Sequence, residues 1–226
     1  MEHQALCKLF RETFPFWDKM SENDRDTFCR TSQHVRFPKG ANIHDGNECT
    51  GIILIQSGAL RVYMLSEDGK EVTLFRLFRG DMCMLSASCV LNAITFDVFV
   101  DAEEESECVV VGGCAFESLS TRMPEAKIFA QEVALARFSD VMWVMQQILF
   151  FSMDKRLAIF LLDEASKTGS DQIKLTHEQI ARYMGSAREV VSRMLKYFAT
   201  EGLLRASRSE GIILLDKARL RALTVN

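Results

Sequence analysis

The alternation of apolar and polar positions is most regular between residues 175 and 201, LTHEQIARYMGSAREVVSRMLKYFATE. Apolar residues recur there every three or four positions on two short stretches, as expected when one face of each of two helices is buried. The apolar positions are Ile180, Ala181 and Met184 in the first stretch and Val191, Met194, Leu195 and Phe198 in the second. The pattern predicts two short amphipathic helices.

Capping signals support this assignment. Thr176 followed by Gln179, and Ser186 followed by Glu189, each have the spacing of a capping box at a helix start. Gly185 lies between the two stretches, where a helix commonly ends in a left-handed residue. The sequence therefore predicts a helix-turn-helix.

Polar residues occupy the outward positions of the second helix. They are Arg188, Glu189, Ser192, Arg193 and Lys196. In a DNA major groove, Arg can bond guanine O6 and N7, and Glu can accept from cytosine N4. Charged outer faces of amphipathic helices are also commonly just solvated, so this face alone leaves both interpretations open.

A β-hairpin is expected directly after the helices. Residues 203–204 and 212–215 are apolar and flank a polar turn at residues 205–211. Such a wing would bring Arg205 and Arg208 to DNA phosphates. We expect the DNA backbone contacts to come from Thr176, Ser186, Lys196, Arg205 and Arg208.

The first half of the chain has a different pattern of apolar residues and glycines. Residues 1–32 have helical patterns, and a helix start is expected at Ser21. Short β-type runs then alternate with glycines at Gly40, Gly46, Gly58, Gly69 and Gly80. Turn signals at these intervals favour an antiparallel barrel or roll, with a hairpin tip at residues 67–70. Residues 82–91 are expected to form a short helix.

A long helix is predicted from residue 124 to about residue 152. Its apolar positions follow the alternating spacing of three and four residues that is typical of a helix paired with a parallel partner. They are Ile128, Gln131, Leu135, Phe138, Met142, Met145 and Leu149. Other apolar positions, at Val133, Val141, Val144 and Ile148, are expected to pack on the helix's own domain.

These elements predict an α+β fold with three parts. Residues 1–121 form an antiparallel β-roll with N-terminal helices, residues 122–152 a dimerisation helix, and residues 153–226 a winged helix-turn-helix domain. Charge is distributed unevenly: residues 153–226 carry 13 Lys/Arg against 9 Asp/Glu, and residues 1–152 carry 14 against 22. A basic end on an acidic body is expected when only that end meets phosphates.

Composition and residue spacing indicate where the protein is located and which kinds of site it is expected to lack. Neither a membrane-length apolar run nor a signal-peptide pattern is evident, so a cytoplasmic location is expected. The seven cysteines lack the paired short spacings of a disulfide framework and are expected to be reduced thiols, although Cys83 with Cys89, or Cys108 with Cys114, could form a redox pair. The four histidines are scattered, and no catalytic motif or metal site is predicted.

The roll, the long helix, a hinge expected at residues 151–154, the helix-turn-helix and the wing, in this order and at this length, resemble the CRP/FNR family of bacterial transcription regulators. The resemblance rests on LTHEQIARYMGSAREVVSRMLKYFATEGLL and on PKGANIHDGNECTGIILIQSGALRVYMLSEDGKEVTLFRLFRGD. It implies a cyclic-nucleotide-binding-like jelly roll and a homodimer bound to double-stranded DNA at a palindrome with TGA-type half-sites. It also implies base contacts from Arg188, Glu189, Ser192 and Arg193. Ala187 departs from the usual Ser or Thr of the family.

The resemblance does not extend to the family's known effectors. Its cyclic-nucleotide contacts match Leu85, Phe96 and Asp97, which offer no cation to a phosphate, so cyclic AMP is not expected. An FNR-type iron–sulfur cluster is not expected either, because only Cys7 and Cys29 lie in the first 35 residues. Haem bound by a cysteine or a histidine stays open, with His34 and His44 as the candidates in the roll, but both histidines are expected at the surface or in loops.

A small apolar effector is the remaining expectation. It would occupy a cavity lined by Met82, Leu85, Phe96, Phe99, Val141 and Met142. The same residues could instead form a filled core. RNA polymerase is a further possible partner, through Glu67 and Asp68 at the hairpin tip. The alternative function is a ligand-binding or redox-sensing adaptor that does not recognise DNA specifically. An enzyme on a cupin-like roll is not expected, because the sequence lacks the clustered histidine and carboxylate metal ligands that such an enzyme needs.

Overall fold

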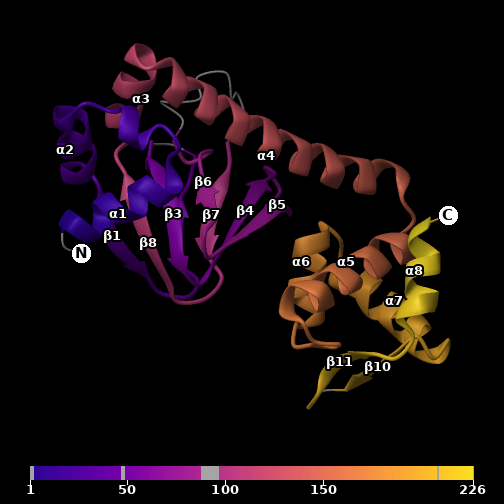
Figure 1. The fold of residues 1–226 in the computed structure, drawn as a ribbon. Helices are drawn as coiled ribbons and strands as arrows, with labels where there is room; N and C mark the ends of the chain where they lie inside the picture. The colour runs from indigo at the N-terminus through magenta and orange to yellow at the C-terminus, as the bar shows by residue number, and fades with distance from the viewer. Residues whose placement is uncertain (1–2, 47–48, 88–96, 208, 226) are drawn as a thin grey trace. The chain divides into compact units, whose positions relative to one another are not determined.

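The computed structural model describes residues 3–46, 49–87, 97–207 and 209–225 (Figure 1). The chain divides into two compact units. The first comprises Met1–Leu65 and Leu74–Val141, and the second comprises Ser66–Thr73 and Met142–Asn226. Within these ranges the structure contains no helix that is both long and apolar enough to cross a membrane.

The N-terminal segment is helical, as predicted. It contains α1 (His3–Thr13), the 3-10 helix η1 (Trp17–Lys19) and α2 (Glu22–Arg30). Ser21 is the N-cap of α2 and accepts a hydrogen bond from the backbone N–H of Asp24, so the predicted helix start is confirmed. Phe10 of α1 and Phe28 of α2 are fully or almost fully buried and meet edge to face at 5.5 Å.

Two four-stranded antiparallel sheets form the roll of the first unit. Their strands are β1 (Gln33–Phe37), β2 (Asn42–His44), β3 (Ile52–Ser57), β4 (Ala59–Leu65), β5 (Glu71–Phe78), β6 (Met82–Cys83), β7 (Phe99–Ala102) and β8 (Ser106–Val111). One sheet has the order β1-β8-β3-β6 and the other β2-β7-β4-β5. Gly69 has a φ of 77° at the predicted hairpin tip. The predicted roll is confirmed.

The predicted helix at residues 82–91 is wrong where the structure describes it. Met82 and Cys83 form β6, which pairs with Ile53 and Leu54 of β3. Methionine and cysteine suit a buried helix or strand equally, so the apolar run did not determine the element. Residues 88–91 of that prediction lie outside the described residues.

Two hydrophobic clusters fill the roll and its helical end. One joins buried residues of α1 and α2 to α3 (Gly113–Arg122) and to Ala126 and Ala130. The other lies between the two sheets and includes Leu60, Val100 and Cys108. Alternate residues of β3 belong to the two clusters, Ile52 and Leu54 to the first and Ile53 and Ile55 to the second. The helices therefore cover the outer face of the β1-β8-β3-β6 sheet, and the second cluster fills the roll (Figure 1).

The long helix α4 spans Pro124–Phe150, close to the predicted range. Its buried residues are Ala126 and Ala130, and Val133 and Val141 pack against the clusters of the first unit. Ile148 was expected to pack inward but is 39% exposed. One narrow face of α4 therefore packs against the hydrophobic clusters, and much of the rest of the helix is exposed to solvent.

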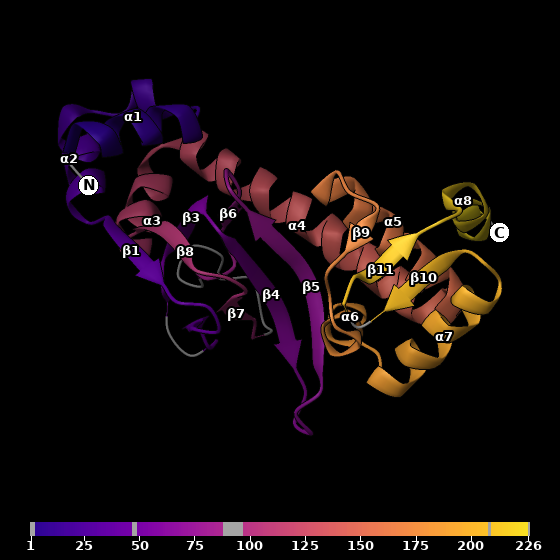
Figure 2. The ribbon, with the colours of Figure 1, turned by 90° about the horizontal axis from the view of Figure 1, so that it is seen from below.

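The second unit contains the predicted winged helix-turn-helix. It comprises α5 (Met153–Thr168), β9 (Gln172–Ile173), α6 (His177–Met184), α7 (Arg188–Thr200), β10 (Leu204–Ser207), β11 (Gly211–Leu214) and α8 (Lys217–Val225). A single cluster of residues such as Leu161, Ile180, Leu195 and Phe198 holds the helices together. The three strands form a sheet in the order β10-β11-β9 (Figure 2).

Candidate nucleic-acid interface

Helix α6 begins and ends as the sequence predicts. The Thr176 side chain accepts from the backbone N–H of Gln179 at 3.1 Å, and the Gln179 side chain accepts from the backbone N–H of Thr176 at 2.9 Å. This reciprocal pair is a capping box. Gly185 ends the helix with a φ of 58°, and the Arg156 guanidinium donates to the carbonyl of Met184. The start and the end of α6 are therefore both fixed.

Helix α7 begins differently from the prediction. Its N-cap is Ala187, which provides no side-chain hydrogen bond. The Ser186 hydroxyl instead contacts the Met153 sulfur at 3.8 Å, so the predicted Ser186–Glu189 capping box is wrong. The N-cap of α7 is therefore one residue later than the predicted Ser186. The first backbone N–H groups of α7 consequently lack a side-chain cap, and helix N-termini of this kind attract phosphate oxygens.

Three of the four expected base-contacting residues lie free on the outer face of α7. Arg188, Glu189 and Arg193 are exposed. The fourth, Ser192, is half-buried, and its hydroxyl lies 2.8 Å from Nδ1 of His177 on α6. The contact between Ser192 and His177, which are fifteen positions apart in the chain, was not predicted from the sequence. Lys196 follows on the same exposed face one turn later.

The wing lies beside α7, and β10 contacts that helix (Figure 2). Arg205 on β10 is exposed and forms an ion pair with Glu210 at 3.1 Å. An exposed pair of this kind contributes little to stability and can be broken when a phosphate replaces the carboxylate. Arg208 lies outside the described residues. Thr176 is exposed and Ser186 half-buried, but the hydroxyls of both already have partners.

An apolar stripe runs along the exposed side of α4. Ile128 is 53% exposed, Leu135 66%, Phe138 59% and Leu149 60%. Met142 and Met145 complete the stripe at 42% and 46%. These are the positions that the spacing assigned to a partner helix. Apolar side chains exposed in such a row are uncommon on the surface of a monomer.

The residues expected to line an effector cavity do not all gather. Leu85 and Val141 belong to the cluster between the sheets, whereas Met82 packs against the cluster at the helical end. Phe99 stacks on Tyr63 at 5.5 Å, and Met142 belongs to the exposed stripe. Phe96 lies outside the described residues. The described members of this set are therefore distributed over two clusters and a surface.

Two buried polar groups in the roll were not anticipated. Arg61 is 2% exposed, pairs with Asp101 at 3.3 Å and lies 3.9 Å from the Tyr63 ring centre. His44 is 4% exposed rather than at the surface, and its Nδ1 lies 2.9 Å from the Thr50 hydroxyl. Burial lowers the pKa of His44, against the opposing influence of nearby carboxylates.

The described cysteines differ in burial and in whether they are free or disulfide-bonded. Cys83 and Cys108 are free and buried, and burial raises the pKa of both thiols, that of Cys108 to about 12. Neither is a reactive thiolate at neutral pH. Cys114 is free and exposed. Cys49 is disulfide-bonded, so the prediction of reduced thiols is wrong there. Cys7 and Cys29 are free and lie side by side.

Comparisons with known proteins agree with this architecture. Residues 34–122 match the cyclic nucleotide-binding domain family, and residues 155–223 match the Crp-like helix-turn-helix domain family. A crystal structure assigned to the crp/fnr family of transcriptional regulators, from Eubacterium rectale, is 41% identical. It superposes with a TM-score of 0.89 and covers 95% of this chain and 100% of its own.

Two curated relatives are more distant. Electron transport regulator A of Shewanella oneidensis is 26% identical over 99% of this chain and 91% of its own length. Transcriptional activator protein FnrA of Stutzerimonas stutzeri is 24% identical over 98% of this chain and 92% of its own length. These relatives are named as regulators rather than as enzymes.

Proposed function

The chain belongs to the CRP/FNR family of transcription regulators, and on that premise we propose that it binds a two-fold symmetric DNA site as a homodimer. The single observation that carries this proposal is the outer face of α7. There, Arg188, Glu189 and Arg193 project freely from a helix whose inner residues Val191, Leu195 and Phe198 are fully or almost fully buried. The folding of the unit thus leaves this face with no structural role among the described residues.

These side chains suit a major groove. Arg188 and Arg193 can each donate two parallel hydrogen bonds to a guanine, and Glu189 can accept from a cytosine amino group. The uncapped start of α7 and the side chains of Lys196 and Arg205 are placed to accept phosphates. Together they support recognition of a half-site with the TGA core that the family resemblance implies.

The exposed stripe of α4 supports the homodimer. Pairing two copies of the helix would bury the same apolar side chains from each, which is the arrangement of a two-fold interface. A dimer of this kind presents two copies of α7 to half-sites about 34–36 Å apart, one turn of the double helix. The affinity for a palindrome then depends on the dimer.

The decisive experiment compares specific and random DNA. Binding of wild type and Arg193→Ala is measured by fluorescence anisotropy on a palindromic TGA-containing duplex and on its scrambled counterpart. Arg193→Ala should weaken binding to the palindrome by about 1–3 kcal/mol and leave binding to the scrambled duplex nearly unchanged. Lys196→Ala is the matched control and should weaken binding to both duplexes. Equal losses for Arg193→Ala on the two duplexes would overturn the base-contacting role.

We propose that an effector of the roll, if one binds, is small and apolar and lies near Leu85 and Val141, the described members of the expected lining that lie at the same cluster. The positions that match the family's nucleotide contacts include Leu85 and the carboxylate Asp97, which disfavour an anionic phosphate. The buried cation Arg61 already pairs with Asp101, so a phosphate would have to compete with that carboxylate. Cyclic AMP and an FNR-type iron–sulfur cluster are therefore not proposed as effectors.

Two further predictions concern partners. Glu67 and Asp68 are exposed at the tip of the β4–β5 hairpin, where contact with RNA polymerase stays a prediction. An adaptor that does not recognise DNA would have no use for the exposed Arg188, Glu189 and Arg193, and it is not favoured. Cytoplasmic action is the natural setting for a regulator that binds chromosomal DNA.

A further inference from the structure

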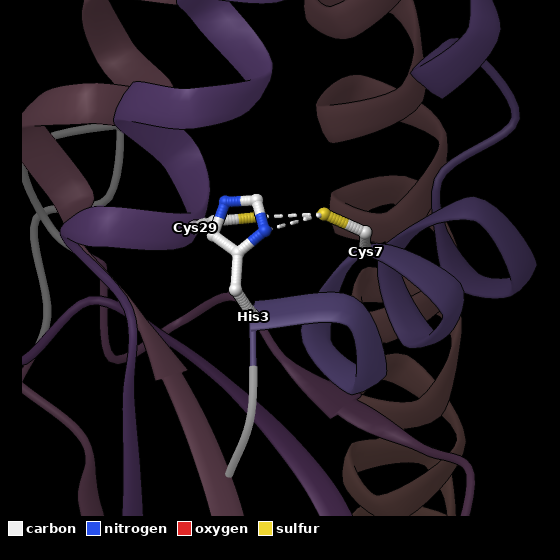
Figure 3. A group of neighbouring side chains, drawn as sticks. All are labelled: His3, Cys7 and Cys29. Carbon is white, nitrogen blue, oxygen red and sulfur yellow. Dashed lines mark hydrogen bonds between the residues drawn. The ribbon is translucent and has the colours of Figure 1, made fainter.

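Three metal-binding side chains meet at the N-terminal end of the chain, in the unit that contains the roll. His3 and Cys7 lie one turn apart on α1, and Cys29 lies near the end of α2 (Figure 3). The Cys7 sulfur is 3.3 Å from the Cys29 sulfur and 3.6 Å from Nδ1 of His3. All three ligand atoms lie within 4.8 Å of one another. We propose that His3, Cys7 and Cys29 bind a single Zn²⁺-like divalent cation.

Apolar packing fixes this arrangement independently of the sulfurs. Leu6 and Phe10 bury the inner face of α1, and Phe28, next to Cys29, is packed edge to face against Phe10 at 5.5 Å. These contacts set the spacing between α1 and α2. The i, i+4 spacing of His3 and Cys7 then directs both side chains to the same point, because such residues are neighbours on a helix surface. The site is preorganised by the core.

The distances suit a shared metal ion. In a tetrahedral zinc site, bond lengths of about 2.3 Å to sulfur and about 2.0 Å to nitrogen place two sulfurs about 3.8 Å apart and a sulfur and a nitrogen about 3.5 Å apart. The His3–Cys7 distance of 3.6 Å already agrees to about 0.1 Å. The two sulfurs would separate by only about 0.5 Å to bind zinc, whereas a disulfide would require them to approach by about 1.3 Å.

A carboxylate lies near the second ring nitrogen of the histidine. Nε2 of His3 is 3.8 Å from the Asp26 carboxylate, which is beyond hydrogen-bond distance. If metal binding at Nδ1 brings the two within reach, the carboxylate would accept from Nε2–H and hold the tautomer in which Nδ1 is free to bind the metal. Binding would release the two thiol protons to solvent and form two metal–sulfur bonds and one metal–nitrogen bond, with no redox change. Water or another ligand can occupy the fourth position.

This donor set differs from the cysteine cluster of FNR-type regulators. Two thiolates and one imidazole match a mononuclear zinc site, and their soft and borderline ligands disfavour Mg²⁺ and Ca²⁺. The site is independent of the DNA-binding residues on α7. A bound ion would tie α1 to α2 and stabilise the folded chain by an amount that rises with the logarithm of the free-ion concentration above the dissociation constant.

The test is a titration of the reduced full-length protein with Co²⁺ alone, which gives thiolate charge-transfer and tetrahedral d–d absorption at a zinc site. One equivalent should bind, and added Zn²⁺ should remove the absorption. Cys7→Ser and Cys29→Ser should abolish the charge-transfer band. Cys114→Ser, which removes the free exposed thiol of α3, is the matched control and should retain it. Asp26→Asn should weaken binding by about 10–100-fold.

Several outcomes would overturn the proposal. They are no absorption from the reduced wild type, a band that survives in Cys7→Ser, or a band that Cys114→Ser removes. Mass spectrometry after alkylation shows whether the purified protein has a Cys7–Cys29 disulfide. If it does, and if the reduced protein then binds no Co²⁺, the two cysteines are a redox pair and not a metal site. Because Cys29 is buried, His3→Ala provides a second variant at an exposed position. It should bind Co²⁺ more weakly while keeping the wild-type melting temperature in the absence of metal.

Discussion

Shortening Leu135 tests whether the apolar stripe of α4 forms the dimer interface. Leu135 is 66% exposed in the single chain, so most of its side chain is available for burial by a partner. Leucine exceeds alanine by three carbons, each worth about 0.8 kcal/mol when buried, or about 2.4 kcal/mol in total. Scaled by the exposed fraction, Leu135→Ala should cost about 1.6 kcal/mol in each protomer and about 3.2 kcal/mol in a symmetric dimer.

That free energy corresponds to a dimer dissociation constant raised roughly 200-fold, because about 1.4 kcal/mol is a factor of ten. Sedimentation velocity over a series of protein concentrations measures the change. Leu215→Ala is the matched control, since Leu215 is 59% exposed but follows β11 and is not part of α4. It should leave the monomer–dimer equilibrium unaltered. An unchanged dissociation constant for Leu135→Ala, or an equal increase for Leu215→Ala, would refute the assignment.

Three further predictions follow from individual contacts. Thr176→Ala removes the capping box of α6 and should lower the free energy of unfolding in urea by about 0.5–2 kcal/mol, whereas Ser186→Ala should change it by less than about 0.5 kcal/mol; similar losses would contradict the two N-cap assignments. Burial lowers the pKa of His44, so the unfolded chain takes up the proton first and stability is lost as pH falls below about 6.5. Thermal melts at a series of pH values measure this loss, which His44→Gln should reduce and the control His34→Gln should not. If the dependence of the melting temperature on pH is the same in His44→Gln and wild type, His44 is not the source of the loss. His177→Ala should reduce discrimination at the base pair that we propose Ser192 contacts by about 0.5–1.5 kcal/mol. Additive losses in the His177→Ala/Ser192→Ala double variant would show that the two residues act separately.

The sequence was most informative where structure is determined locally. The start and the end of α6 follow from Thr176, Gln179 and Gly185, because capping hydrogen bonds join residues close in the chain. The buried positions of α7 follow from the helical period for the same reason. Local rules failed at Ser186, because the path of the turn places Ala187, which has no capping side chain, at the N-cap of α7.

Contacts between distant segments could not be predicted in the same way. Cys7 and Cys29 meet because the aromatic core packs α1 on α2, and spacing along the chain contains no record of that packing. Arg61 and Asp101 pair because β4 and β7 are adjacent in the sheet, with Arg61 directly opposite Asp101. Met142 was assigned both to a cavity and to the dimer seam, and only its 42% exposure distinguishes the two.

The hydrogen bond between Ser192 and His177 bears on how α7 recognises bases. A serine hydroxyl has one donor and two acceptor sites, whereas a neutral imidazole nitrogen is either a donor or an acceptor. If the Ser192 hydroxyl donates to Nδ1, it can only accept from DNA and would favour an adenine or cytosine amino group. If Nδ1 donates instead, Ser192 keeps its O–H for guanine O6 or thymine O4. The tautomer of a residue on α6 would thus select the base preferred by a residue on α7, so base preference at this position depends on both helices.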